Sequence, residues 1–354
     1  MKGLVLSGGE GTRLRPLTFT QAKQLIPVAN KPVLFYGLEA LSRAGIREIG
    51  IVVGDTHREI ERAVGDGSRF SANITYIHQE KPLGLAHAVL ISELFLEGEN
   101  FLMYLGDNLL KEELLPFKER FLSEKADALL LLVEVKNPSQ FGVAEIRKER
   151  VVRLVEKPED PPSNLALAGV YFFSKKIIEA AKKIKPSWRG ELEITDAINE
   201  LLKGGAKVIF QKTSGWWKDT GKPEDILEAN RLVLDDLETD IQGEVVDCSI
   251  EGRVKIGKGS LIKKSRILGP AIIGEGVQIL NSYIGPYTSI QDGVSLDSVE
   301  IENSIVLGNS VIKNIEGRIH SSLIGREAKI IRKGGHPRGL SLILGERSTM
   351  EFNG

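Results

Sequence analysis

The 354-residue sequence predicts an α/β protein, in which a mostly parallel sheet flanked by helices is followed by a left-handed parallel β-helix. Strand-like and helix-like segments alternate through the first two-thirds of the chain, and this order favours parallel strands with helices on both faces. Helical patterns then disappear, and single apolar residues recur every six positions, which is typical of a coil with three short sides. The sequence therefore predicts two domains, residues 1–238 and residues 239–354.

The first domain is predicted from its apolar runs and its helical spacings. Leu34, Leu38 and Leu41, for example, recur at the spacing of one helix face. The expected helices are Lys31–Ala44, a charged segment ending at about Val64, Leu83–Leu96 and Pro223–Leu237. The expected strands are Lys2–Leu6, Ile49–Val53, Ile74–His78, Phe101–Leu105, Ala128–Val135, Gly142–Ile146, Val151–Glu156, Ala166–Phe173 and Lys207–Gln211.

The second domain is predicted from apolar triplets that recur 17 residues apart. The triplets are Ile250, Ile256 and Ile262, then Ile267, Ile273 and Ile279, then Ile284, Ile290 and Leu296. Related short blocks repeat beside them: CSIEG (248–252), SRILG (265–269), NSYIG (281–285), NSIVLG (303–308) and SSLIG (321–325). We expect the isoleucines to stack inside the coil and the glycines to form its tight corners.

Composition excludes several classes of partner. With 47 Lys and Arg against 48 Asp and Glu, the formal net charge is −1, which argues against a general nucleic-acid binder. The single cysteine, Cys248, excludes an intrachain disulfide. The longest apolar run, Ala128–Val133, is too short to cross a bilayer. We therefore expect a cytoplasmic protein with no nucleic-acid and no membrane partner.

A glycine-rich segment, Ser7–Pro16, follows the first expected strand directly. Its glycines let backbone N–H groups come close to phosphate oxygens, and Arg13 and Lys23 supply positive charge for a triphosphate. Leu14 stands where a dinucleotide-binding fingerprint needs glycine, and the Gly-Lys-Ser/Thr ending of a P-loop is absent from this segment. The glycines are Gly8, Gly9 and Gly11.

Polar residues also stand at the ends of later strands. Gln79 has an amide that can both donate to and accept from the edge of a pyrimidine. Asp107 lies where α/β sheets bind ligands, and its carboxylate oxygens suit a hard cation. Glu156 can accept hydrogen bonds from sugar hydroxyls, and Lys157 is a point charge suited to a sugar phosphate.

Two segments, GGEGTRLRP at 8–16 and PVANKPVLFY at 27–36, resemble the sugar nucleotidyltransferase family. GLAHA at 84–88 is closer to the thymidylyl branch, the glucose-1-phosphate thymidylyltransferases, and the repeats are similar to their long form with a C-terminal β-helix. The resemblance covers nearly the whole chain and implies a Rossmann-like nucleotidyltransferase domain. It also implies that glucose 1-phosphate attacks the α-phosphate of dTTP with Mg²⁺, making dTDP-glucose and pyrophosphate.

The resemblance further implies roles for individual residues. Asp107 and Asp219 match the magnesium ligands of the family, and Gln79 with Gly84 match the residues that read thymine. The residues implied as catalytic are Arg13, Lys23, Asp107, Lys157 and Asp219. The residues implied in substrate binding are Gly8, Gly9, Gly11, Thr12, Gln79, Gly84, Asn108, Gly142, Glu156 and Leu167.

Two alternative functions stay open at the level of sequence. The first is the same chemistry with UTP, another nucleoside triphosphate or another sugar 1-phosphate. Leu85 favours thymidylyl transfer, because adenylyl and acetylglucosamine uridylyl enzymes usually carry Thr there. The second is a non-catalytic regulatory subunit that binds nucleotide sugars. This alternative is disfavoured by the intact residues Arg13, Lys23, Asp107 and Asp219. A dinucleotide-dependent oxidoreductase is disfavoured by Leu14.

The histidines and the coil suggest no second activity. The five histidines show no metal-binding spacing, and His320 and His336 form no convincing acetyltransferase constellation. Because the catalytic segments all precede the coil, we expect the chemistry to survive removal of the coil in principle. The coil is expected to join subunits into a homo-oligomer and to stabilise the protein.

Overall fold

The structure, a computed structural model, describes residues 1–332 and 348–349. It divides into two compact units that do not follow the order of the chain. The first unit contains Met1–Glu10, Gln21–Leu25 and Val33–Asp219, and the second contains Gly11–Thr20, Ile26–Pro32 and Thr220–Gly354. The domain limits at residues 238 and 239 stay a prediction, and the tail from residue 335, with His336, lies outside the described residues.

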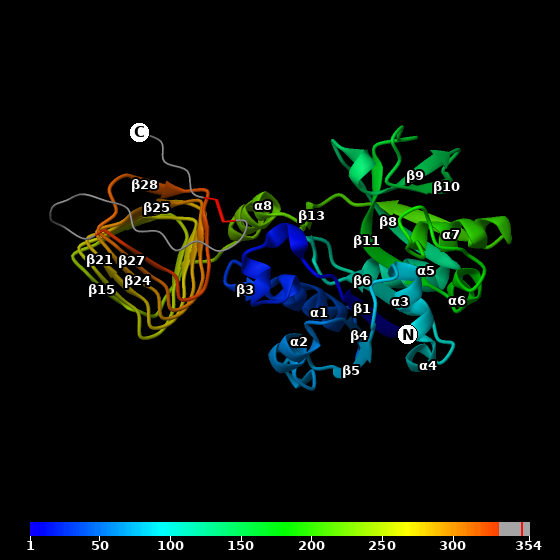
Figure 1. Cartoon of the computed structure of the whole chain (residues 1–354), viewed down its shortest axis with the longest axis horizontal. Coiled ribbons are helices and arrows are strands. Elements are labelled where there is room, and N and C mark those ends of the chain that lie inside the picture. Colours follow the sequence, from blue (N-terminus) through cyan, green and yellow to red (C-terminus); the bar gives the residue numbers. More distant parts are fainter. Residues whose placement is uncertain (333–347, 350–354) are drawn as a thin grey trace. The chain divides into compact units, whose positions relative to one another are not determined.

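Within the described residues, the first unit is built on a nine-stranded mixed sheet (Figure 1). Its strand order is β10-β9-β11-β6-β1-β4-β5, with β8 beside β11 and β12 beside β8. The predicted parallel pairing is confirmed for β6-β1-β4-β5, whereas β11 runs antiparallel to β6, β8 and β9. The strands are β1 Lys2–Ser7, β4 Glu48–Val53, β5 Asn73–His78, β6 Phe101–Leu105, β8 Ala128–Glu134, β9 Gly142–Arg147, β10 Arg150–Glu156, β11 Leu165–Phe173 and β12 Val208–Lys212.

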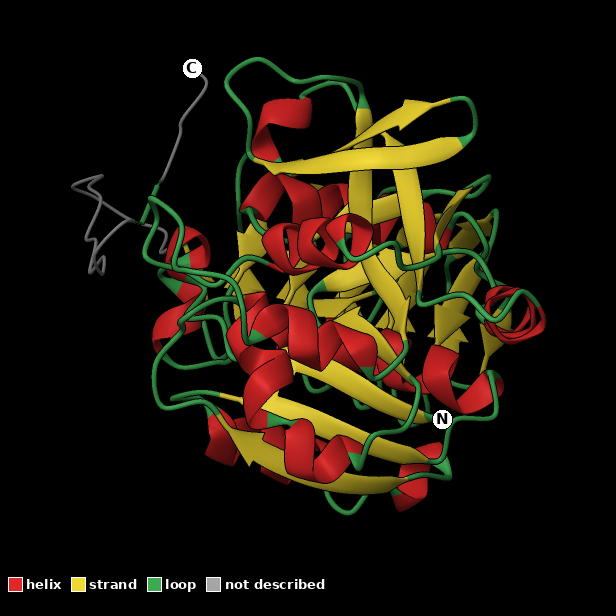
Figure 2. Ribbon diagram, turned by 90° about the vertical axis from the view of Figure 1, so that its right-hand side faces the viewer, coloured by secondary structure: helices red, strands yellow, loops and turns green. Residues whose placement is uncertain are grey.

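Helices cover both faces of this sheet (Figure 2). Successive strand residues point to opposite sides, so each strand contributes apolar side chains to two cores, one on each face. Leu4 of β1 enters the core under α3, α6 and α7, and Val5 enters the core under α1, α2 and α5. The predicted helix Leu83–Leu96 is divided at Ser92, whose hydroxyl donates to the Ala88 carbonyl oxygen at 2.7 Å. The helices are α1 Val33–Arg43, α2 His57–Val64, α3 Leu85–Ile91, α4 Glu93–Leu96, α5 Leu115–Ser123, α6 Lys176–Ala181 and α7 Ile194–Lys203.

The pairing register of the parallel strands places their carboxyl ends side by side. Ser7 of β1 lies beside Val53 of β4, and Val53 lies beside His78 of β5. Leu105 of β6 pairs with Leu6 of β1 on the other side. The carboxyl ends of the four parallel strands therefore meet at one edge of the sheet, where α/β proteins bind ligands.

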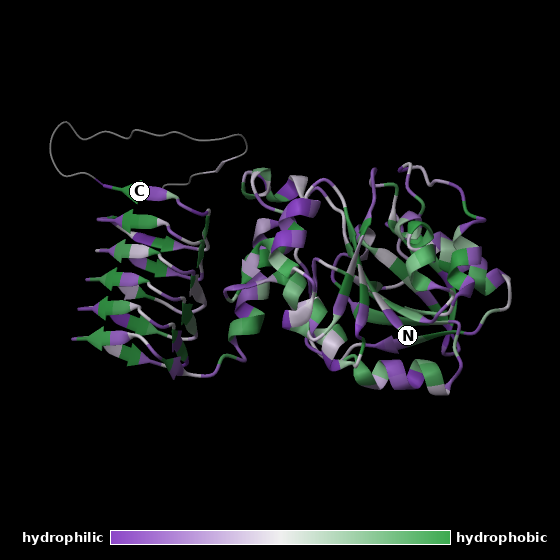
Figure 3. Ribbon diagram, turned by 90° about the horizontal axis from the view of Figure 1, so that it is seen from below, coloured by the Kyte–Doolittle hydropathy of each residue, from purple (hydrophilic) through white to green (hydrophobic). Residues whose placement is uncertain are grey.

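The second unit is a coil of short parallel strands in three sheets, as in the predicted left-handed β-helix (Figures 1 and 3). One sheet holds β14 Asp240–Ile241, β17 Val254–Ile256, β20 Ala271–Ile273, β23 Thr288–Ile290, β26 Ile305–Val306 and β29 Leu323–Ile324. The second holds β15 Glu244–Val246, β18 Leu261–Lys263, β21 Gln278–Leu280, β24 Ser295–Asp297, β27 Val311–Lys313 and β30 Lys329–Ile331. The third holds β16 Ser249–Glu251, β19 Arg266–Leu268, β22 Tyr283–Ile284, β25 Glu300–Glu302 and β28 Arg318–His320.

The predicted apolar triplets form columns inside the coil. Ile256 pairs with Ile273 and Ile273 pairs with Ile290, and all three are buried. Glycine corners are found in one column, Gly259, Gly276 and Gly293, with φ of 69°, 62° and 69°. In a neighbouring column the same left-handed conformation is adopted by residues other than glycine. These residues are Asp247, Lys264, Asn281 and Ser298.

The second unit also includes two short segments from the N-terminal part of the chain. The hairpin of β2 (Pro27–Val28) and β3 (Lys31–Pro32) is held by Asn230 of α8 (Pro223–Leu234), whose side-chain oxygen accepts from the Ala29 N–H at 2.8 Å. The same buried amide accepts from the Ser289 hydroxyl at 2.7 Å and donates to the Tyr287 carbonyl at 2.9 Å. Asn30 donates to the Ile290 carbonyl at 2.7 Å. The coil therefore anchors the β2–β3 hairpin, a segment from the N-terminal part of the chain.

This anchoring gives the coil a role beside the predicted subunit contacts. We expect Asn230→Ala to lower the free energy of unfolding by about 1–3 kcal/mol, because one buried and two partly buried hydrogen-bonding groups lose their partner. Denaturant unfolding, with the exposed Asn73→Ala as control, tests this. A wild-type free energy of unfolding for Asn230→Ala would remove the anchoring role.

Candidate functional site

The glycine-rich loop leaves β1 at the edge where the parallel strands end. A Cβ on Gly8 would lie 3.2 Å from the Gln79 side-chain oxygen, and a Cβ on Gly9 would lie 2.9 Å from Cε of Lys23. The absence of side chains here lets the backbone pass directly beside Gln79 and Lys23. The structure thus brings together four of the predicted residues at the end of β1.

Lys23 and Asp107 form an ion pair beside this loop. Asp107 follows β6 directly, and the Gly106 N–H before it donates to the Leu6 carbonyl at 2.9 Å, which holds the turn against β1. Only 16% of the Lys23 side chain and 17% of the Asp107 side chain are exposed. The pair is therefore largely screened from water, where charge–charge interactions are stronger than at the surface.

Asp219 reaches the same place through a small ribbon. The strands β7 (Asn108–Leu110) and β13 (Trp217–Asp219) are antiparallel, and Asp219 lies opposite Asn108, the residue after Asp107. Asp219, the last residue of β13, thus lies opposite the residue that follows Asp107 in the chain. The carboxylate oxygens of the two aspartates are the donors that a hard cation such as Mg²⁺ prefers, so the donor set fits the metal that the sequence predicts.

Asn108 itself is buried, with 3% of its surface exposed. Its side-chain N–H donates to the Ala168 carbonyl at 3.2 Å, and its own carbonyl accepts from the Tyr104 hydroxyl at 3.1 Å. Gly169 has a φ of 72°, and a Cβ there would lie 1.9 Å from the Asn108 amide nitrogen. In this structure Asn108 joins β7 to the bulge of β11, so its predicted sugar contact stays a prediction.

Gln79 lies at the predicted base-binding position, next to Gly8. Its side-chain nitrogen lies 2.9 Å from Nδ1 of His87 and 3.4 Å from the Gly84 carbonyl oxygen. Gly84 has a φ of 104°, and a Cβ there would lie 2.4 Å from the Leu192 carbonyl oxygen. Gly84 is therefore required by close packing, and α3, which begins after it, supplies His87 to orient Gln79.

The predicted sugar-binding residues gather at a second place in the first unit. Gly142 pairs with Glu156, and a Cβ on Gly142 would lie 3.1 Å from a Glu156 carboxylate oxygen and 3.0 Å from Leu167. The Thr195 hydroxyl of α7 donates to the same carboxylate at 3.4 Å. Lys157 follows with its backbone N–H donating to the Phe141 carbonyl at 3.0 Å, and its side chain is exposed.

The remaining predicted residues belong to the second unit. Gly11 has a φ of 66° and begins the short 3-10 turn Thr12–Leu14, in which Leu14 is buried and Arg13 is exposed. The Thr18 hydroxyl donates to the Gly11 carbonyl at 2.7 Å and closes this turn. The structure describes Gly11, Thr12 and Arg13 within that unit and groups none of them with Lys23 and Asp107.

Comparison with known proteins identifies the family. The nucleotidyl transferase family model matches residues 2–236. The chain belongs to this family. Two glucose-1-phosphate thymidylyltransferases, from Streptomyces antibioticus and Streptomyces griseus, are 51% and 50% identical to it, over 99% and 100% of each chain respectively. A crystal structure from Bacillus anthracis, provisionally named for the same activity and bound to sucrose, is 36% identical, with a TM-score of 0.64 over 68% of this chain and 97% of its own.

Several residues that the sequence analysis missed lie around Glu156, one of the predicted sugar-binding residues. Arg189 lies 3.6 Å from Glu156, 3.2 Å from the buried Glu193 and 2.8 Å from Glu191. Thr195 follows on α7. All of these stand in one stretch, RGELEIT at 189–195, whose charge could have marked it, but no strand or helix pattern placed it beside Glu156.

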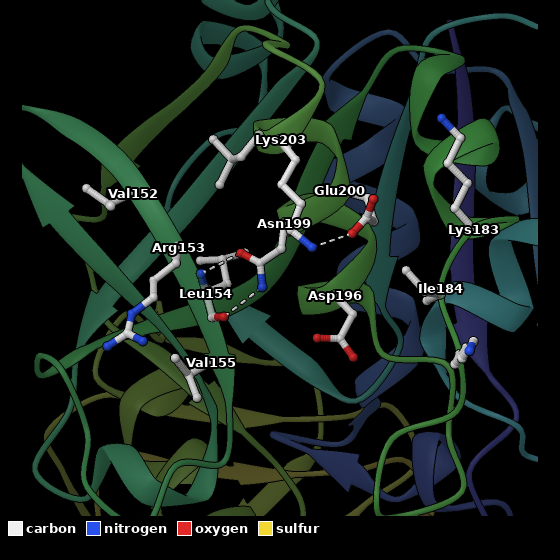
Figure 4. A pocket seen from close by; sticks show the side chains of 12 residues that line it. Val152, Arg153, Leu154, Val155, Lys183, Ile184, Asp196, Asn199, Glu200 and Lys203 are labelled. Atoms are coloured by element: carbon white, nitrogen blue, oxygen red, sulfur yellow. Dashed lines mark hydrogen bonds and ion pairs between the residues drawn. The ribbon is translucent and has the colours of Figure 1, made fainter.

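A groove of about 720 Å³ lies between β10 and α7, away from the predicted residues (Figure 4). Asn199 bridges it by accepting from the Leu154 N–H at 2.9 Å and donating to the Leu154 carbonyl at 2.8 Å. Lys203 pairs with Glu200 on its rim. The bridge fixes α7 against β10, the strand that ends at Glu156. Among the described residues, no helix is long and apolar enough to span a membrane.

Burial raises the pKa of Glu156 from 4.5 to about 7, with a further contribution from the charge of Glu193. Lys157 and Arg189 oppose this shift and lower the pKa. The folded protein therefore holds a proton on Glu156 between these two pH values, whereas the unfolded chain does not. This group favours folding below pH 4.5, and its contribution is lost as the pH rises through 7.

Glu156→Gln should remove this dependence, because the amide stays neutral at every pH. Relative to wild type, the variant should gain on the order of 1–3 kcal/mol between about pH 5 and about pH 8, since one pKa unit corresponds to about 1.4 kcal/mol. Denaturant unfolding at both values measures the gain. Glu149→Gln, at the exposed turn between β9 and β10, should follow wild type. Parallel curves for wild type and Glu156→Gln would mean that the Glu156 pKa is not raised.

Proposed function

We propose that this protein transfers the thymidylyl group of dTTP to glucose 1-phosphate, making dTDP-glucose and pyrophosphate. The observation that carries the proposal is the meeting of Gly8, Gly9, Lys23 and Asp107 at the end of β1, with Asp219 on the neighbouring ribbon. A glycine-lined backbone, one cation and two carboxylates are what a triphosphate with its metal requires. The high identity to two full-length thymidylyltransferases supports this choice.

The reaction asks the protein mainly for position and charge. An oxygen of the sugar phosphate attacks the α-phosphorus of dTTP, a new P–O bond forms, and the bond to the β-phosphate breaks as pyrophosphate leaves. Because the sugar phosphate is already a nucleophile, no general base is needed. Lys23 and Arg13 neutralise the triphosphate and the departing pyrophosphate, and Lys157 holds the incoming sugar phosphate.

Asp107 and Asp219 would hold Mg²⁺ in this proposal. The ion supplies charge neutralisation between the two reacting phosphates when it is bound. Lys23 holds Asp107 close to the loop, because its ammonium group pairs with the carboxylate. The family is generally dependent on divalent metals, and the carboxylate donors favour magnesium over softer ions.

The base and the sugar are read at the two remaining places. Gln79, oriented by His87, presents its side-chain oxygen beside Gly8 and can pair with the edge of thymine. Glu156, with Gly142 and Leu167 around it, accepts hydrogen bonds from sugar hydroxyls. The donor of the nucleotidyl group is a nucleoside triphosphate. We further propose that the protein works in the cytoplasm as a homo-oligomer whose subunits are joined through the coil.

A panel of substrates tests the proposal. We expect pyrophosphate release with dTTP and glucose 1-phosphate to show the highest kcat/KM when dTTP, UTP, ATP and GTP are each combined with several sugar 1-phosphates. Chromatography of the nucleotide sugar identifies the product. A preference for UTP would move the protein to the uridylyl alternative. Nucleotide-sugar binding without release from any pair would leave the regulatory subunit.

Asp107→Asn should lower turnover by about 10²–10³-fold and raise the magnesium concentration needed for half-maximal rate. The amide keeps the shape of the side chain but loses the charge that faces both the metal and Lys23. Rates across a magnesium series measure both effects. The exposed coil residue Asp247 provides the control, Asp247→Asn, which should match wild type. Superimposable magnesium curves for Asp107→Asn and wild type would reduce Asp107 to a turn residue.

A further inference from the structure

Two histidines and a glutamate meet between α2 and β5, outside the residues used above. His57 and Glu61 stand one turn apart on α2, so their side chains share one face of the helix. His78 is the last residue of β5. One ligand atom from each of the three lies within 4.8 Å of the other two. The sequence showed no metal spacing because the set combines a helix with a distant strand.

The geometry of the cluster suits a metal ion. Nε2 of His78 lies 3.6 Å from a Glu61 carboxylate oxygen, and the rings of His57 and His78 are 4.8 Å apart. Two ligands on one tetrahedral zinc ion are separated by about 3.4 Å, given bonds of about 2.1 Å. Side-chain movements of about 1–1.5 Å would therefore bring the three ligand atoms to zinc-binding distances. The His78 side chain is 56% exposed, so an ion can reach the cluster from solvent.

His57 also has the support that metal-binding histidines usually have. Its Nδ1 lies 3.3 Å from the Gly54 carbonyl oxygen. When Nδ1 carries the proton and donates to that oxygen, Nε2 is left as the ligand atom and the ring is held in place. Two imidazoles and one carboxylate, with a fourth position open to water, form a donor set that Zn²⁺ and its neighbours in the transition series prefer over Mg²⁺.

We propose that His57, Glu61 and His78 bind one transition-metal ion of the Zn²⁺ class. The ion would join α2 to the end of β5, next to Gln79. Glu59 of the same helix accepts from the Ala22 N–H at 2.6 Å, beside Lys23. The cluster therefore adjoins Gln79 in the chain, and its helix contacts the residue before Lys23, so bound metal would steady both.

Zinc titration of the full-length, chelator-treated protein tests the proposal. With excess Mg²⁺ present to fill carboxylate sites, competition against a chromogenic chelator should reveal one tight equivalent of Zn²⁺ per chain. His57→Ala and His78→Ala should each weaken binding at least about tenfold, and the double variant should lose the tight equivalent. His320→Ala, which removes a histidine from β28 in the coil, should bind as wild type does.

Two further measurements keep the outcome decisive. Circular dichroism must show that the variants are folded, and Zn²⁺ should raise the Tm of wild type but not of the double variant. Asp107→Asn should keep the tight equivalent, because the proposed magnesium ligands are not involved. Equal zinc affinity in wild type and the double variant, or loss of the equivalent in Asp107→Asn alone, would overturn the proposal.

Discussion

The parallel pairing of β1 with β4 and β6 is the constraint on which the predicted site depends. Parallel strands need cover on both faces, and the alternation of Leu4 and Val5 between two cores provides it. With both faces covered, only the strand ends remain open to a ligand. Because the strands run the same way, the glycine loop after β1 and the aspartate after β6 emerge at one edge. The ion pair of Lys23 with Asp107 forms there.

Close backbone approach is the second requirement of the site, and it explains several glycines at once. Gly84 and Gly169 both have positive φ, and a Cβ on either would collide with a neighbouring group. Gly84 lets the start of α3 pack on Leu192, so that His87 can orient Gln79. Gly169 lets Asn108 join the β7–β13 ribbon to β11, so that Asp219 lies beside the turn of Asp107. Close packing at these two glycines therefore positions residues that the sequence predicts to contact substrate.

The coil is stabilised by a different principle, which is the stacking of equivalent residues in register. Burial of each isoleucine contributes roughly 1.5–3 kcal/mol, and identical turns repeat this contribution along the column. The buried Asn230 then connects the coil to the β2–β3 hairpin through three hydrogen bonds. The hairpin, which is far from the coil in the sequence, thus belongs to the same compact unit as the coil and Arg13. The hairpin and the coil are therefore joined by side-chain hydrogen bonds, although they are far apart in the sequence.

The sequence by itself determined the alternation of strands and helices in the α/β core and the repeats of the coil, whereas the substrate contacts stay predictions. Apolar periodicity acts locally, so it predicted β6 and the columns of Ile256 and Ile273 correctly. The mixed direction of β11, the division of the helix at Ser92 and the small β7–β13 ribbon were decided only by tertiary contacts. The same holds for Arg189 and Thr195 beside Glu156, and for the meeting of His57 with His78. Such groupings depend on how segments that are distant in the sequence pack together. The spacing of residues along the chain does not reveal which of these segments come close in space.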